Sequence, residues 1–209
     1  MNSIDKYKKQ VIGARSRAAG EFFESQIEAS IQWHIDRGLM KAEKTPEPMK
    51  PLKPTGYNGQ FIACYTKKAQ SDFSGTIRGG RSIRFEAKQT DSDRFERKRL
   101  TDEQMKDLRQ HQELGALCFV LLCFGINRIY RVPWEVWDRM KELFGRQYVT
   151  ERDVARFRIP YVAGVIKILH GILDPNDLPD IILPDICVAC GKYAGEGTHI
   201  CPDCREKSK

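Results

Sequence analysis

The chain has 209 residues, of which 41% are hydrophobic and 30% charged, a composition typical of a soluble globular protein with a sizeable core. Its formal net charge is +7 and its pI is about 9.0, so a polyanionic partner is favoured. No run of about 18 apolar residues occurs, which argues against a membrane span. No basic amphipathic anchor is visible either, so nucleic acid is the expected partner.

Residues 1–19 are basic and show no packing pattern. We expect a flexible basic arm there, and because this segment has no apolar core of the kind that directs secretion, we expect a cytoplasmic protein. From Gly20 onward, Phe23, Ile27 and Ile31 recur with helical spacing. The sequence therefore predicts a helix over residues 20–37.

A proline-rich stretch follows this helix. Lys44 to Thr55 contains four prolines, and proline interrupts both helices and central strands. We expect a linker or an extended projection over residues 44–70. Three short strand patterns come next, and Gly79-Gly80 supplies the turn between the last two. The expected strands are 61–65, 72–77 and 81–89.

The second half of the chain alternates helical and apolar patterns. Thr101 can cap a helix that Gly115 ends, and Pro133 fits the first turn of another helix. Between them, the apolar run 116–125 suits a strand buried on both faces, and 127–132 suits an edge strand. The pattern predicts an α/β fold in which a mixed central sheet is flanked by helices.

The predicted hairpin brings an aspartate, a glutamate and a lysine close together. Asp72 is followed after thirteen residues by Glu86-Ala87-Lys88. Alternate side chains share a face of a strand, so Glu86 and Lys88 project together while Phe85 and Ala87 point into a core. Carboxylates bind a hard divalent cation, and a neighbouring ammonium can position or activate water for attack on phosphate. The sequence therefore predicts a metal-dependent nuclease.

The Asp-x13-Glu-x-Lys pattern resembles the PD-(D/E)xK nuclease superfamily, with Ser71-Asp72 in place of its frequent Pro-Asp. Within this superfamily the chain resembles the RecU-type Holliday junction resolvases, whose fold is restriction-endonuclease-like. The resemblance covers roughly residues 20–170. It rests on Gly20-x-x-Phe23-Glu24, the proline-rich segment, Asp72-Phe73-Ser74-Gly75, Phe85-Glu86-Ala87-Lys88, and Gln104 with Gly115 and Phe119.

The resemblance implies a role for each matching residue. Asp72, Glu86 and the backbone carbonyl of Ala87 would bind a catalytic Mg²⁺ or Mn²⁺, and Lys88 would orient the attacking water or stabilise charge on the phosphate. Glu24 corresponds to an acid that completes the site, although a solvated helix residue is equally compatible with its position. Gln104 would have a supporting catalytic role, and Glu103 stands where the family has histidine.

Four cysteines near the end form a second motif. Cys187-x2-Cys190 and Cys201-x2-Cys204 are separated by ten residues, a pattern typical of a tetrahedral structural Zn²⁺ site. Two disulfides fit a cytoplasmic chain poorly, and His199 is a weaker candidate for a ligand. We expect a nuclease domain over residues 20–172, a linker over 173–186 and a zinc ribbon over 187–209.

Basic residues surround the hairpin. A run of charges is usually a solvated surface, but beside a site that cuts phosphodiesters basic side chains can contact DNA phosphates. The candidate DNA-binding residues are Arg78, Arg81, Arg84, Arg97, Lys98 and Arg99.

The expected function is that of a homodimeric endonuclease which resolves four-way DNA junctions in recombination and repair. The dimer is implied by the resemblance, as is the projection at 44–70 that enters the junction. Two alternatives stay open: a nuclease of the same superfamily that acts on duplex or flap DNA, and a non-enzymatic DNA-binding factor that uses the zinc ribbon.

Overall fold

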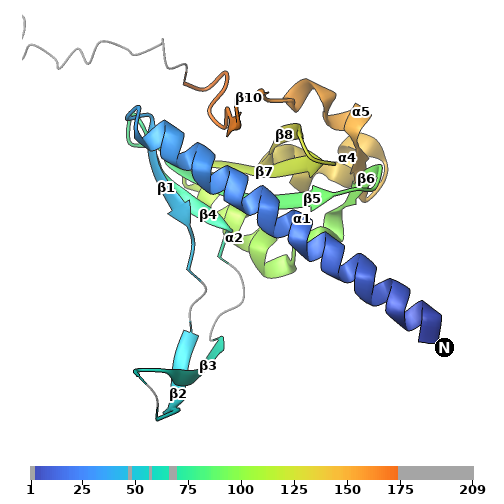
Figure 1. The fold of residues 1–209 in the computed structure, drawn as a ribbon. Helices are drawn as coiled ribbons and strands as arrows, with labels where there is room; N and C mark the ends of the chain where they lie inside the picture. The colour runs from blue at the N-terminus through green and yellow to red at the C-terminus, as the bar shows by residue number, and fades with distance from the viewer. Residues whose placement is uncertain (1–2, 47–48, 57, 66–69, 174–209) are drawn as a thin grey trace, which may run out of the picture. The chain divides into compact units, whose positions relative to one another are not determined.

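The computed structural model describes residues 3–46, 49–56, 58–65 and 70–173 (Figure 1). The chain divides into a compact unit over residues 1–170 and a second unit over 171–209. The predicted linker and zinc ribbon lie outside the described residues, apart from residue 173. The fold described below is that of the first unit.

Helices and short strands alternate along this unit. Their bounds, in chain order, are α1 (Ser3–Ile35), β1 (Met40–Lys44), β2 (Met49–Pro54), β3 (Phe61–Tyr65), β4 (Phe73–Ile77), β5 (Ser82–Thr90), β6 (Arg94–Glu96), η1 (Arg97–Arg99), α2 (Asp102–Glu113), β7 (Leu117–Phe124), β8 (Arg128–Pro133), α3 (Trp134–Asp138), α4 (Met140–Phe144), β9 (Tyr148–Thr150), α5 (Glu151–Val154), η2 (Ala155–Phe157), β10 (Tyr161–Val162) and β11 (Val165–Ile166).

The centre of the unit is a five-stranded mixed sheet in the order β1-β4-β5-β7-β8. Strands β4 and β5 form the antiparallel hairpin, β5 and β7 are parallel, and β8 is an edge strand antiparallel to β7. Helix α1 crosses one face (Figure 1), and α2 and α3 pack on the other through the apolar core. The predicted class, a mixed sheet flanked by helices, is confirmed.

Stacked aromatic rings hold the three central strands in register. Phe73 of β4 pairs with Phe85 of β5, which pairs with Phe119 of β7. The ring centroids are 4.9 Å apart in the first pair and 4.7 Å in the second, and all three side chains are buried. Such cross-strand aromatic pairs stabilise a sheet. They fix the strand register on which the neighbouring Asp72 and Glu86 depend.

A glycine on β4 permits close contact with β1. Gly75 lies opposite Ala42, and a Cβ atom at this position would overlap the carbonyl oxygen of Lys41 and the Cα atom of Ala42. Only glycine leaves room for this approach. Strand β1 itself was not predicted from the sequence, because its residues Met40–Lys44 alternate only two buried side chains with exposed ones.

The first helix differs from its prediction. We expected a flexible arm followed by a helix from Gly20, but α1 begins at Ser3 and is continuous to Ile35, so the expectation of an arm without regular structure was wrong. Residues 3–19 contain no proline and one glycine, Gly13, and are otherwise largely compatible with a helix. The apolar periodicity begins later because side chains such as Val11 and Ile12 are exposed.

The proline-rich segment forms its own small sheet. Strands β2 and β3 pair with each other and with no strand of the central sheet. All six residues of β2 are exposed. This fits an edge strand, the position in a sheet where proline, which lacks an N–H group, is tolerated. Strand β3 matches the expected bounds 61–65. Among the described residues, no helix combines the length and the apolar character needed to span a membrane.

The helix predicted after Pro133, over residues 134–144, is broken in two. Helix α3 ends at Asp138, and α4 begins at Met140. Between them Arg139 has φ −92° and ψ 20°, outside the helical region. The break turns the chain while Trp134, Trp137 and Met140 stay buried.

Candidate active site

The hairpin and the first turn of α2 bring four of the predicted residues together. Asp72 directly precedes β4, Glu86 and Lys88 are alternate residues of β5, and Gln104 is in α2. Phe85 and Ala87, beside and between the charged residues, are buried as predicted. The side-chain alternation of a strand thus turns Glu86 and Lys88 toward one side, where α2 lies.

Lys88 joins the two carboxylates. Its Nζ atom lies 2.9 Å from Oδ2 of Asp72 and 2.8 Å from Oε2 of Glu86. The Glu86 side chain has no exposed surface, whereas Lys88 is 18% and Asp72 25% exposed. Buried charges require partners of opposite sign, and here Asp72 and Glu86 share the ammonium group of Lys88 as that partner.

Backbone groups fix the two carboxylates relative to each other. The N–H group of Ala87 donates to Oδ2 of Asp72 at 3.0 Å, and the N–H group of Asp72 donates to Oε1 of Glu86 at 3.1 Å. These two bonds connect the start of β4 to the middle of β5. The carboxylates are therefore positioned by the main chain and not only by their rotamers.

Gln104 completes the cluster because a helix cap orients its amide. Its Oε1 atom accepts from the N–H group of Thr101 at 3.0 Å, while the Thr101 side chain accepts from the Gln104 N–H group. This reciprocal capping box leaves the Nε2 group free to donate to Oε2 of Glu86 at 2.6 Å. The predicted supporting position of Gln104 therefore has a geometric basis.

Burial shifts the protonation equilibria of the cluster. Desolvation raises the pKa of Glu86 to about 8, and the negative charge of Asp72 acts in the same direction while Lys88 opposes it. Burial acts to lower the pKa of Lys88, but the attraction of Glu86 and Asp72 outweighs it and holds that pKa above its usual value. Without a further cation, the cluster favours a protonated Glu86 beside a charged Lys88.

Glu24 lies with a different partner. Its Oε2 atom accepts from Nζ of Lys44 at 2.6 Å, and both side chains are partly exposed. Lys44 ends β1, and the next residue, Thr45, donates its N–H group to the carbonyl oxygen of Asp72 at 2.9 Å. Glu24 therefore belongs to the surroundings of Asp72 through Lys44, and it is not hydrogen-bonded to the cluster.

Three of the predicted DNA-binding arginines lie against the protein itself. Arg78 donates to the carbonyl oxygens of Gly38 and Arg37 at 3.1 Å each. Arg81 donates to the carbonyl oxygen of Gly115 at 2.9 Å, just beyond the end of α2. Arg84 has its Nε atom buried, without a hydrogen-bond partner among the described residues.

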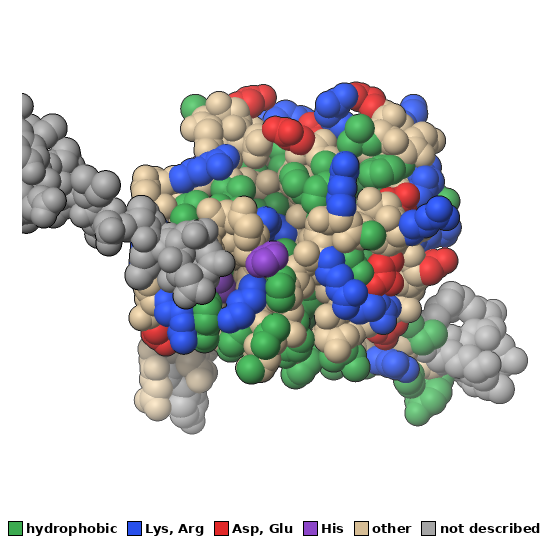
Figure 2. Space-filling model, turned by 90° about the horizontal axis from the view of Figure 1, so that it is seen from above, with side chains coloured by type: hydrophobic (Ala, Val, Ile, Leu, Met, Phe, Trp, Pro, Cys, Tyr) green, Lys and Arg blue, Asp and Glu red, His purple; other side chains and the backbone are tan. Residues whose placement is uncertain are grey.

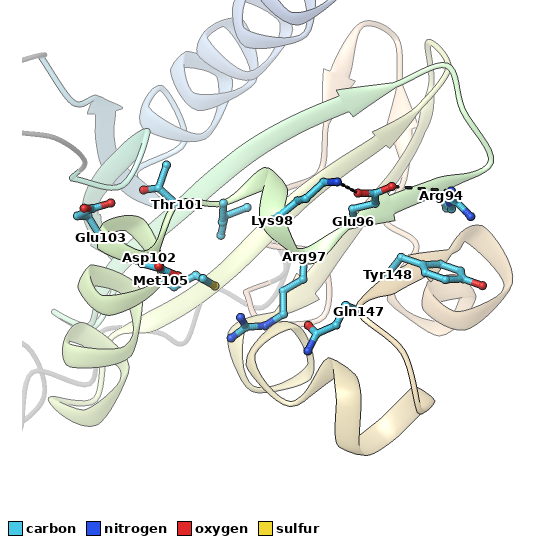
Figure 3. A pocket seen from close by; sticks show the side chains of 11 residues that line it. Arg94, Glu96, Arg97, Lys98, Thr101, Asp102, Glu103, Met105, Gln147 and Tyr148 are labelled. Carbon is cyan, nitrogen blue, oxygen red and sulfur yellow. Dashed lines mark ion pairs between the residues drawn. The ribbon is translucent and has the colours of Figure 1, made fainter.

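The other three basic candidates form the η1 segment, and two of them lie at a cavity of about 850 Å³ (Figure 3). Lys98 and Arg97 line it, Lys98 pairs with Glu96 at 2.6 Å, and Arg97 pairs with Asp138 at 3.1 Å. Arg99 donates to the carbonyl oxygen of Gln89 at 2.6 Å. Residues at the start of α2 form one side of the cavity, and Gln147 and Tyr148 lie across from them (Figure 3).

The basic side chains do not gather into one positively charged patch on the face drawn in Figure 2. On the face drawn in Figure 2, Lys and Arg side chains are spread among acidic and apolar groups. The net charge of +7 is therefore not a sufficient guide to the DNA-facing surface. The cavity beside α2 is a more specific candidate, because α2 also carries Gln104. Its charged lining residues are Arg94, Arg97 and Lys98 on the basic side and Glu96, Asp102 and Glu103 on the acidic side.

Comparison with known proteins identifies the family. The model of the RecU family, described as recombination protein U, matches residues 18–159. That match covers more than half of the chain. The chain belongs to the RecU family. The matched range contains Glu24, Asp72, Glu86, Lys88 and Gln104, and the four cysteines of the predicted zinc ribbon lie beyond it.

Two RecU relatives support this assignment. The chain is 31% identical over 138 residues to the Holliday junction resolvase RecU of Streptococcus gordonii, covering 63% of this chain and 68% of that protein. It is 28% identical over 188 residues to RecU of Bacillus pumilus, covering 77% and 90%. A solved structure of Hjc, a Holliday junction resolvase from Archaeoglobus fulgidus, aligns with a TM-score of 0.41 and 13% identity, over 66% of this chain and 93% of Hjc.

Asp72 and Glu86 are the two carboxylates that could hold the divalent cation implied by the RecU resemblance. Asp72 and Glu86 already converge on one cationic group, the ammonium of Lys88. Among the described residues, no group of three or more His, Cys, Asp or Glu side chains could hold a metal ion. Two carboxylates with water and substrate oxygen are a donor set that suits Mg²⁺, which keeps part of its hydration shell.

Some residues around this candidate site were not found by sequence reasoning. Lys44 gave no signal because it lies in a strand that was not predicted. Gln147 and Tyr148 reach the cavity from a segment far along the chain, and pairing of β6 with β9 places them there. A pattern within one sequence could not reveal this proximity. Thr101 was predicted as a helix cap, and its capping box with Gln104 confirms it.

Proposed function

We propose that this junction-resolving endonuclease of the RecU family cuts DNA at the cluster of Asp72, Glu86, Lys88 and Gln104. The observation that carries the proposal is the convergence of both carboxylates on Lys88 within hydrogen-bond distance. The two carboxylates, with the backbone carbonyl of Ala87, would hold Mg²⁺ or Mn²⁺. When bound, such an ion polarises the phosphate and makes a bound water more acidic.

The side chains of the chain have distinct parts in the reaction. Lys88 carries its proton, because the two acids hold its pKa above the usual value, so it is suited to orient water and to stabilise negative charge on the phosphate. Gln104 holds one oxygen of Glu86 at 2.6 Å and keeps that carboxylate aimed at the site. Glu24 would join once the Lys44 ammonium is displaced or turned toward a phosphate.

The basic side chains of the cavity support a path for the DNA backbone. Arg94, Arg97 and Lys98 line it, and Tyr148 offers an aromatic ring beside Arg94, whose guanidinium lies 4.9 Å from the ring centroid. Phosphate contacts of this kind give affinity without reading sequence. Arg78 and Arg81, which bind backbone carbonyls, would contribute chiefly by holding the hairpin.

The family supports a proposal for the substrate and for the assembly. A four-way junction has two-fold symmetry, and a homodimer would present two such clusters to symmetry-related strands. The β2–β3 hairpin, with its exposed β2, is the segment we assign to the projection that enters the junction. Asp72, Glu86 and Lys88 are retained together, which favours an enzyme over a binding factor.

The cysteine-rich segment is proposed as a structural zinc ribbon separate from catalysis. Four thiolates satisfy tetrahedral Zn²⁺ and leave no open position for chemistry. The double variant Cys187→Ser with Cys190→Ser should therefore contain no zinc, measured by elemental analysis, while its cutting rate stays near that of the wild type. Wild-type protein without zinc would contradict the assignment.

A cleavage comparison tests the proposed function. The protein is incubated with a mobile four-way junction, a linear duplex and a flap of matched length, each with Mg²⁺ and with EDTA. We expect paired symmetric cuts in the junction with Mg²⁺ and no cuts with EDTA. Equal cutting of all three substrates would instead indicate a general nuclease, and tight junction binding without any cutting would indicate a binding factor.

A further inference from the structure

Helix α2 contacts the metal-binding end of the hairpin at two points. Gln104 donates to Glu86, and Asp107, almost one turn later, accepts from the backbone N–H group of Ser71 at 3.2 Å through its Oδ2 atom. Residues three apart on a helix lie on the same side. The same face of α2 therefore reaches both the segment before β4, which carries Asp72, and strand β5, which carries Glu86.

Asp107 is placed to act on the main chain. Its side chain is 20% exposed and lies between α2 and the hairpin, with His111 Nε2 3.7 Å from its Oδ1 atom. Ser71 is fully buried. A buried N–H group that loses its partner is costly, so the carboxylate constrains where the Ser71 peptide can lie.

The Ser71 peptide leads directly into Asp72. The Asp72 N–H group is held by Glu86 at 3.1 Å, and the Asp72 carbonyl oxygen is held by the N–H group of Thr45 at 2.9 Å. Asp107 adds the contact on the N-terminal side, so that three bonds in succession fix the backbone around Asp72. Of these, the Asp107 bond is the one made by a side chain that does not itself touch the cluster.

We propose that Asp107 is a positioning residue that sets the Asp72 carboxylate relative to Glu86 by holding the Ser71 N–H group. This inference rests on the proposed function, because it takes Asp72 and Glu86 as the metal ligands. The bond requires a residue with an N–H group before Asp72. Proline in position 71, the residue most frequent before this aspartate in the PD-(D/E)xK pattern, would have none.

The chain offers matched variants for a test. Asp107→Ala removes the acceptor, Asp107→Asn keeps an acceptor oxygen without the charge, Ser71→Ala keeps the N–H group, and Ser71→Pro removes it. Mn²⁺ affinity of the DNA-free protein is measured by calorimetry, together with kcat and KM on a four-way junction and the melting temperature.

We expect Asp107→Ala to weaken Mn²⁺ binding and lower kcat by about 10- to 100-fold, the range seen when a residue that orients a metal ligand is lost. The junction KM should change little. Asp107→Asn should recover most of both quantities, and Ser71→Ala should match the wild type. In the Ser71→Pro background, Asp107→Ala should cause no further loss.

Two results would overturn the inference. One is wild-type Mn²⁺ affinity and kcat in Asp107→Ala with only a lower melting temperature, which would make Asp107 purely structural. The other is a full additional loss from Asp107→Ala when Ser71 is already proline. If Ser71→Pro does not fold, as judged by circular dichroism, equal losses in Asp107→Ala and Asp107→Asn would overturn the inference in its place. Wild-type cutting by Asp72→Asn would sink the proposed site itself, a separate failure.

Discussion

The proposed catalytic cluster and the charged cavity beside it hold their charges in opposite ways. In the cluster, Glu86 is fully buried and Lys88 is 18% exposed, and each ionic group contacts another. In the cavity, Lys98 is 84% exposed and Arg94 is 50% exposed, with Glu96 as their shared partner. The two regions are joined by the N-terminal turn of α2.

This difference in burial predicts a difference in energetic behaviour. Buried charges interact strongly and depend on one another, so removal of one leaves the others unbalanced. Exposed pairs contribute little to stability and are screened by salt. The cluster is therefore suited to chemistry that needs fixed geometry, and the cavity to a mobile polyanion that binds by many weak contacts.

The largest effect is expected from Lys88→Ala. It removes the ammonium that lies 2.9 Å and 2.8 Å from the two carboxylates, and we expect cutting to fall at least about 100-fold, since loss of one preorganised group that stabilises developing charge has this magnitude. Cutting is measured in single-turnover reactions on a four-way junction. Junction binding, measured by gel shift in Ca²⁺, should stay within a few-fold of the wild type.

Asp72→Asn provides an isosteric partner to this experiment. It keeps the shape of the side chain and removes a ligand charge, so it should also abolish cutting. If either variant cuts at the wild-type rate, the reaction occurs elsewhere. The buried cluster would then not be the active site.

The second effect concerns the pKa of Glu86. In the metal-free protein, burial raises that pKa from its ordinary 4.5 to about 8, and a proton must leave before Glu86 can bind a metal ion. We therefore expect Mg²⁺ binding at pH 7 to release about one proton, and its apparent affinity to rise with pH and level off above about pH 8. Calorimetry in buffers of different ionisation enthalpy measures the proton.

The raised pKa of Glu86 also makes the stability of the fold depend on pH. A folded-state pKa above the unfolded value means that the proton stabilises the fold, fully below pH 4.5 and no longer once the pH has risen through about 8. The metal-free protein should therefore lose stability between about pH 4.5 and pH 8, and Glu86→Gln should remove that loss. An unchanged pH dependence in Glu86→Gln would assign the effect to another group.

The sequence predicted the cluster because its signals are local. Strand alternation places Glu86 and Lys88 on one side of β5, and the Gly79-Gly80 turn returns the chain to Asp72; both glycines have positive φ angles, 91° and 85°. Thr101 as a helix cap is likewise a local pattern. These short-range rules were enough to place three catalytic candidates and to give the bounds of the hairpin strands approximately.

The cavity and the residues that surround the cluster were less predictable from the sequence, because they depend on pairing between segments that are distant in the chain. Tyr148 reaches the η1 region through β6–β9 pairing, and Lys44 approaches Glu24 through β1. The basic arginines near the hairpin were grouped by sequence proximity alone, whereas Arg78 and Arg81 turn to backbone carbonyls. Complete burial of Glu86 also required tertiary packing.

A smaller effect should come from the helix turn that joins the two regions. Gln104→Ala removes both the bond to Glu86 and half of the capping box, so we expect about tenfold slower cutting and a stability loss of about 1 kcal/mol. Thr101→Ala is the matched control, because it weakens the cap and leaves the Gln104 amide present. It should show the stability loss, measured by urea unfolding, with near-normal cutting. Equal slowing in both variants would make Gln104 a structural residue only.

The smallest effect is expected from Lys98→Ala, in the exposed cavity. Its side chain is 84% exposed and pairs with Glu96, so folding stability should change by less than about 0.5 kcal/mol. If it contacts a phosphate, junction affinity falls a few-fold at low salt, and the slope of log affinity against log salt becomes shallower by about 1. Arg139→Ala removes the same charge from a side chain that pairs with Glu142 and does not line the cavity. An equal change in slope for both variants would mean that net charge, and not the cavity, sets DNA affinity.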